Sequence, residues 1–101
     1  MRVFLIIRMT NTTTKKFNTF ISRPLQDSTL SDIPGVGKSS LLKLLSMSMD
    51  TPEKLMGLYL FSNRNPETVK LWLITNCTIR AQEAGKISEA IDKKAQASML
   101  C

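Results

Sequence analysis

Apolar residues recur near helical spacing along most of the chain, and this pattern predicts an all-α fold. The clearest case is the C-terminal stretch, where one face of a long helix would carry Ile87, Ala90, Ile91, Ala95 and Met99. A short helix is expected from about Asp27 into a glycine-containing hairpin. Longer helices are expected over residues 14–20, 38–47, 52–61, 66–77 and 80–99.

Capping residues and prolines set the expected boundaries. Two segments place a capping side chain before a proline at the first helical position and an acid in the first turn: Thr51, Pro52 and Glu53, and Asn65, Pro66 and Glu67. Pro24 interrupts the chain after the first helix, whose candidate caps are Thr12, Thr13 and Thr14. With no internal repeat and no long linker, residues 12–101 are expected to form one small domain of about five helices.

Residues 1–11 are expected to be an extension before that domain. Residues 3–7 are apolar, but this run is too short for a secretory signal or a membrane span. Three interpretations stay open: a disordered start, an extra strand, or a segment upstream of a second methionine, Met9.

Residues 30–45 have the pattern of a helix end, a Gly-Val-Gly turn and a second helix. Gly35 and Gly37 can take positive φ angles and leave room for a close approach, and the free N–H groups of the next helix would attract an anion. Lys38 and Lys43 would remain available to solvent or a ligand, while five apolar residues pack the helices together: Ile33, Val36, Leu41, Leu44 and Leu45. This is the helix-hairpin-helix pattern, which typically binds the DNA backbone without reading bases.

The same segment allows two other interpretations. Gly37, Lys38 and Ser39 also end a nucleotide-binding P-loop, but that motif needs a glycine at position 32, which is Asp32. A carboxylate there would repel phosphates, and no hydrophobic strand precedes the segment, so nucleotide hydrolysis is not expected. A glycine turn that merely joins two packed helices stays an open alternative.

Charge and composition favour binding over catalysis. The net charge is +6, and residues 1–48 carry seven basic side chains against two acidic ones, so most of the excess surrounds the hairpin. The chain has no histidine, few carboxylates and two cysteines, so neither an enzyme active site, a metal site nor a cofactor is expected. Cys77 is expected to be a buried apolar residue and Cys101 a free thiol near the end.

A second surface is suggested farther along the chain. The helix over 66–77 is apolar around much of its circumference, so it is either central to the core or shared with a second chain. Gly57 lies inside the preceding helix, where glycine costs about 1 kcal/mol relative to alanine, and this favours a close contact with another helix or a partner. A glycine that simply faces water is the alternative.

Together these segments resemble barrier-to-autointegration factor, a family of small chromatin proteins of animal nuclei. The resemblance runs without gaps from about Thr12 to Met99 and rests on five pieces: residues 20–24, residues 35–37, residues 57–61, residues 71–73 and Cys77. It implies a compact helical, SAM-like domain that forms a homodimer and bridges two DNA duplexes. It also implies a location in the nucleus and cytoplasm, or in a virion or viral factory if a virus encodes the chain.

The resemblance also implies roles for individual residues. DNA-contact roles carry over to Lys16, Gly35, Val36, Gly37, Ser39, Lys43 and Ala81, and the basic residues Lys38 and Arg80 are added as neighbours. Gly57, Leu58 and Trp72 correspond to the dimer and its groove for LEM-domain proteins. Thr12, Thr13 and Thr14 correspond to a cluster that vaccinia-related kinases phosphorylate to release DNA, as added negative charge beside Lys15 and Lys16 would explain.

Some positions depart from the family. Gln82 replaces a DNA-contacting lysine, for which the nearby Arg80 could substitute, and the last helix lacks the family's second tryptophan and its cysteines. Much of the partner groove differs, so LEM-domain binding stays open. A protein-interaction adaptor with a purely structural hairpin, and a detached accessory domain of a DNA-repair enzyme, are the alternative functions.

Overall fold

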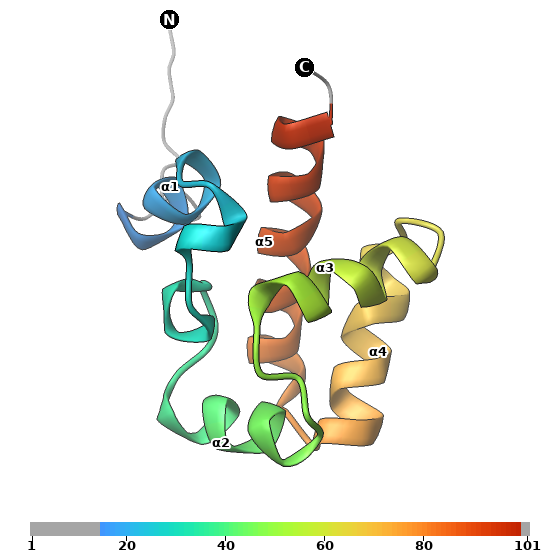
Figure 1. Cartoon of the computed structure of the whole chain (residues 1–101). Coiled ribbons are helices and arrows are strands. Elements are labelled where there is room, and N and C mark those ends of the chain that lie inside the picture. The colour runs from blue at the N-terminus through green and yellow to red at the C-terminus, as the bar shows by residue number, and fades with distance from the viewer. Residues whose placement is uncertain (1–14, 100–101) are drawn as a thin grey trace, which may run out of the picture.

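Helix α5 (Ala81–Met99) is the element on which the rest of the structure is assembled (Figure 1). The computed structural model describes residues 15–99, and within them the chain forms five α-helices, two 3-10 helices and no strand. Before α5 the order is α1 (Lys15–Ser22), η2 (Leu25–Asp27), η3 (Leu30–Asp32), α2 (Lys38–Ser46), α3 (Pro52–Phe61) and α4 (Pro66–Cys77). The prediction of an all-α fold with about five helices is confirmed.

The predicted caps form as expected at α3 and α4. Thr51 Oγ1 accepts a hydrogen bond from the Lys54 N–H at 3.3 Å. Asn65 Oδ1 accepts one from the Glu67 N–H at 2.9 Å, and Pro52 and Pro66 occupy the first helical positions. These local signals explain why both helices have the bounds expected from the sequence.

The segment before the hairpin differs from its prediction. The short helix expected from about Asp27 is present only as η3, a single 3-10 turn that begins at Leu30, and extended residues separate it from η2. Asp32 closes η3 by accepting hydrogen bonds from Thr29, and Ile33 is held extended before Pro34. A proline at each end therefore leaves room only for short 3-10 turns.

The core lies where the apolar faces of α1, α3 and α4 meet α5. Small and branched side chains of α5 let its neighbours approach closely. Fully or almost fully buried side chains include Phe20, Ile33, Leu44, Leu55, Tyr59, Val69, Leu73, Ile79, Ile87 and Ile91. Tyr59 also donates a hydrogen bond to Asp92 at 2.5 Å, which ties α3 to α5, and burial raises the pKa of this phenol.

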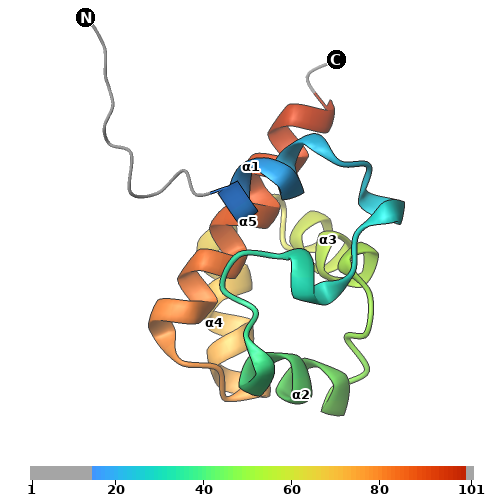
Figure 2. The same ribbon diagram turned by 90° about the vertical axis from the view of Figure 1, so that its left-hand side faces the viewer.

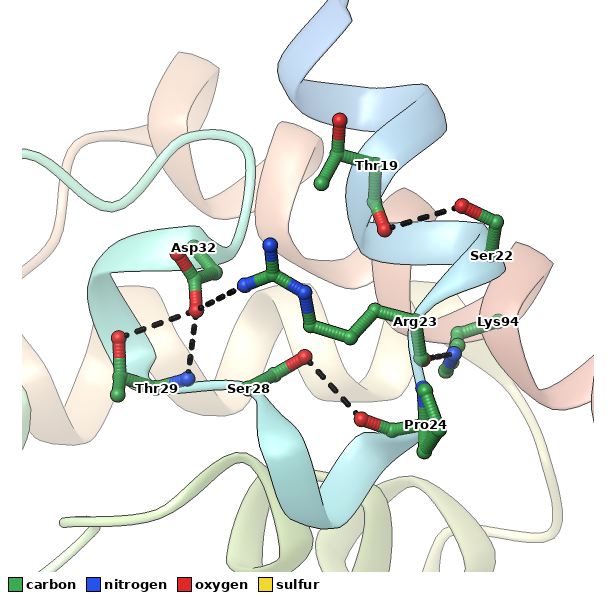
Figure 3. Close-up of polar contacts among 8 residues, drawn as sticks. All are labelled: Thr19, Ser22, Arg23, Pro24, Ser28, Thr29, Asp32 and Lys94. Atoms are coloured by element: carbon green, nitrogen blue, oxygen red, sulfur yellow. Dashed lines mark hydrogen bonds and ion pairs between the residues drawn. The ribbon is translucent and has the colours of Figure 1, made fainter.

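Lys94 holds α1 against α5. Its side chain is only 4% exposed, and its ammonium donates a hydrogen bond to the Ile21 carbonyl at 2.9 Å. It donates a second one to the Arg23 carbonyl (Figure 3). The ammonium also lies 5.7 Å from the centre of the Phe20 ring. Burial lowers the pKa of Lys94, so the carbonyls at the end of α1 and the aromatic ring compensate a costly buried cation.

Lys94→Met is expected to destabilise the fold by about 1–3 kcal/mol, because it leaves two carbonyl groups without their donor. Lys93→Met is the matched control, since Lys93 is exposed on the same helix, and it should change stability by about 0.5 kcal/mol or less. Urea unfolding followed by circular dichroism measures both. Equal stability of the two variants would show that Lys94 does not hold α1.

Candidate nucleic-acid interface

The hairpin between η3 and α2 lies at the N-terminal end of α5 (Figure 2). The Val36 N–H donates to the Ile33 carbonyl at 3.1 Å and closes the turn. Ile33, Val36 and Leu44 are buried as predicted. Leu41 is half-buried, and the prediction for Leu45 is wrong, because α2 turns this residue outward and leaves it 45% exposed.

Gly35 fixes the hairpin against α5. Its φ of +95° confirms the predicted positive φ, which side chains other than glycine rarely adopt. A Cβ atom at this position would lie 2.9 Å from the Glu83 carbonyl oxygen and 2.9 Å from Lys86 Cβ. The hairpin therefore packs on α5 at a distance that only glycine allows.

Gly37 has a different role from the one predicted. Its φ of −96° is an ordinary extended value, so the expected positive φ is wrong here, and no atom lies within 4 Å of a Cβ built on it. Gly37 is the N-cap of α2, and its carbonyl accepts the Leu41 N–H at 2.9 Å. Within the described residues no side chain caps α2, and Gly37, Lys38 and Ser39 are exposed, so the first N–H groups of α2 have no side-chain partner.

Cations border this open helix start. Lys38 and Ser39 are exposed in the first turn of α2, and together with Leu42 and Lys43 they line a shallow hollow. Lys43 is only half-buried, but its ammonium is not free as predicted, because it donates to the Thr78 carbonyl at 3.0 Å. Two of its three donor positions remain for another acceptor.

The start of α5 completes the same surface. Arg80 is 81% exposed and pairs with Glu83 across 3.6 Å, and Glu83 also accepts a hydrogen bond from Ser40 Oγ at 3.4 Å. Ala81 is exposed in the first turn. The structure thus brings eight of the predicted DNA-contact residues to the hairpin and the adjoining helix starts: Gly35, Val36, Gly37, Lys38, Ser39, Lys43, Arg80 and Ala81.

Asp32, the acid nearest the hairpin, already has hydrogen-bond and ion-pair partners. Asp32 accepts hydrogen bonds from the Thr29 N–H at 2.8 Å and hydroxyl at 3.2 Å, and it pairs with Arg23 at 3.3 Å (Figure 3). The Thr29 backbone bond, with the charges of Arg23 and Lys16, lowers the pKa of Asp32. Asp32 therefore offsets phosphate attraction less than its charge alone suggests, and Lys16 is exposed on α1.

Two residues beside the hairpin were missed from the sequence. Glu83 and Lys86 lie on α5, far along the chain from the glycines, and no local motif connects the two segments. Their distances from Gly35 appear only when α5 is placed. The sequence held one signal for Lys86: it follows Gln82 by one helical turn, and Gln82 stands where the family has a DNA-contacting lysine.

The second predicted surface lies on α3 and α4, away from the hairpin (Figure 1). Gly57 is exposed, and within the described residues nothing approaches a Cβ built on it. The interpretation that Gly57 contacts another helix of the chain is therefore wrong, and only contact with a partner or water remains. Leu58 and Trp72 are half-buried against the core, and the exposed apolar residues of these helices are Leu60, Phe61 and Leu71.

The remaining predictions are resolved only in part. Thr12, Thr13 and Thr14, the extension 1–11 and Cys101 lie outside the described residues. Cys77 is buried as predicted, and burial raises the pKa of its thiol. Across residues 15–99 no three metal-ligating side chains cluster, and none of the helices there has the length and apolar content needed to cross a bilayer.

The fold and this surface define a small helical domain whose glycine hairpin exposes backbone at the start of a helix, beside lysine side chains. The family model of barrier to autointegration factor matches residues 11–98, so the chain belongs to this family of SAM-like helical domains. No curated protein matches the chain. The family is one of non-enzymatic DNA-binding proteins, and membership therefore supports DNA binding and is consistent with the absence of catalysis.

Gly35→Ala is expected to lower the free energy of unfolding by about 2–4 kcal/mol, because it adds a strained φ and a clash with α5. Gly37→Ala is the matched control and should cost about 1 kcal/mol or less, since its Cβ site is open. Urea unfolding of both variants measures the difference. A Gly35 variant as stable as the Gly37 variant would contradict the close packing of the hairpin on α5.

Proposed function

We propose that the protein binds double-stranded DNA through backbone phosphates at the hairpin, without reading bases, and that a homodimer bridges two duplexes. The observation that carries this proposal is the uncapped start of α2 beside the Gly35 turn, bordered by Lys38 and Lys43. Membership in the barrier-to-autointegration-factor family supports DNA binding in general. We further propose that residues 12–101 form the binding domain and that it acts in the nucleus and cytoplasm.

The hairpin suits a phosphate for three physical reasons. Free N–H groups at the start of α2 donate hydrogen bonds, and the helix dipole adds positive potential there. Gly37 has no side chain to hold the DNA backbone at a distance. Because α5 fixes the turn through Gly35, these donors are ordered before DNA arrives and lose little entropy on binding.

Duplex DNA fits this surface better than single strands do. Single-strand binding relies on aromatic side chains on which bases stack. Phe61, the most exposed large apolar residue in the described chain, lies on α3 and not at the hairpin. The hairpin instead offers amides, hydroxyls and cations, which are the groups that contact phosphates.

The second surface supports self-association. Leu60, Phe61 and Leu71 expose apolar area on α3 and α4, and Gly57 would let a partner helix approach closely. Dimerisation is general in the family. The same exposed residues also favour a second candidate function, an adaptor that binds a LEM-like protein at this surface, where Trp72 is half-buried against the core.

Gly37→Glu is expected to weaken duplex binding by about tenfold or more, since a carboxylate at the start of α2 repels phosphates. The extended backbone and open space at Gly37 should preserve the fold. Mobility-shift titrations with unrelated duplex sequences measure affinity, and Thr68→Glu, at an exposed position in the first turn of α4, is the control with an equal charge change. Unchanged affinity in the Gly37 variant would contradict the hairpin as the binding site.

The log of wild-type affinity should also fall linearly with log salt, by about 0.9 per neutralised phosphate. A binding constant that does not respond to salt would exclude the phosphate contacts proposed here.

Gly57→Glu is expected to convert the dimer to a monomer, because it places a charge among exposed apolar residues. Sedimentation equilibrium measures the mass, and co-capture of two differently labelled duplexes measures bridging. The variant should still bind one duplex but lose bridging, whereas Gly37→Glu should remain dimeric. A wild-type protein that is monomeric at micromolar concentration would contradict the bridging proposal.

A further inference from the structure

We infer that Lys86 is an additional phosphate-binding residue, and that the DNA contact continues from the hairpin onto the side of α5. This inference rests on the proposed function of the hairpin. Lys86 Cβ would lie 2.9 Å from a Cβ atom at Gly35, so the lysine side chain leaves α5 directly beside the turn. Among the described residues, the three atoms nearest to that Cβ position belong to Glu83, Lys86 and Ile87, and of these side chains only Lys86 is basic.

Lys86 is also available, unlike most cations near the site. Its side chain is exposed and, within the described residues, forms neither a hydrogen bond nor an ion pair. By contrast, Lys43 donates to the Thr78 carbonyl, Arg80 pairs with Glu83, and Arg23 pairs with Asp32. An unpaired cation gives up no existing partner when it takes a phosphate, so more of its electrostatic attraction contributes to binding.

The acids around Lys86 do not cancel its charge. Glu83, one turn earlier on α5, is engaged by Ser40 and Arg80. Glu89, less than one turn later, is exposed and is not within ion-pair distance of Lys86. Lys38 in the first turn of α2 and Lys86 on α5 thus bring positive charge to the glycine turn from two different helices.

This arrangement has a mechanical consequence for binding. Gly35 sets the distance between the turn and α5, so it also sets the distance between the α2 amides and Lys86. A DNA strand seated on the amides would meet a cation already placed at the next position along α5. The α2 amides and the Lys86 ammonium would then bind neighbouring phosphates of one DNA strand.

The test compares Lys86→Gln with Lys54→Gln in salt titrations of duplex binding. Both variants remove one positive charge, but Lys54 lies on α3 outside the site. We expect the log–log salt slope of Lys86→Gln to fall by about 0.9 and its affinity to drop several-fold. Lys54→Gln should match wild type, and Lys86→Arg should restore the slope because it keeps the charge.

If wild type binds duplex DNA and Lys86→Gln retains the full slope, the inference about Lys86 is wrong while the hairpin proposal stands. If wild type does not bind, the proposed function itself fails. A second measurement needs no substitution: acetylation of the wild-type protein with and without duplex, read by mass spectrometry. The Lys86 amine should be protected by DNA and the Lys54 amine should not, and equal modification of Lys86 in both samples would overturn the inference.

Discussion

The close packing of the hairpin on α5 at Gly35 is the constraint on which the binding surface depends. A residue with φ of +95° and a backbone carbonyl 2.9 Å from its Cβ position can only be glycine. This contact sets the direction in which α2 leaves the turn, so it determines where the free N–H groups of α2 point. Gly35, which the sequence predicts as a turn residue open to a close approach, is therefore approached by α5 of the same chain.

Side-chain hydrogen bonds also fix three other helices to α5. Lys94 fixes the end of α1 to it, Tyr59 and Asp92 fix α3, and Ser40 and Glu83 fix α2. The hairpin and the apolar surface of α3 and α4 consequently occupy different sides of one scaffold (Figure 1). Separate sides allow a chain to bind DNA with one surface and another protein copy with the other, and they make the two activities separable by substitution.

Local chemistry was predictable from the sequence, and long-range contacts were not. Thr51 and Asn65 act within four residues, so the bounds of α3 and α4 follow from the chain alone. Gly35 was assigned its φ correctly, but its packing against Glu83 and Lys86 depends on where α5 lies. Lys94 has the sequence appearance of a surface lysine, yet the carbonyl groups that make its burial possible come from α1. Leu45 was predicted to be buried but is exposed, because the nine-residue helix α2 buries only a narrow face.

The DNA-binding function proposed for this protein depends on the main-chain amides at the start of α2. The most direct measurement is a nuclear magnetic resonance titration of isotope-labelled protein with a short duplex, which reports every backbone amide separately. We expect the largest shifts from Gly35 to Ser40, on the uncapped side of the turn. Shifts confined to the residues around Gly57 and Trp72, with the hairpin amides unchanged, would contradict it.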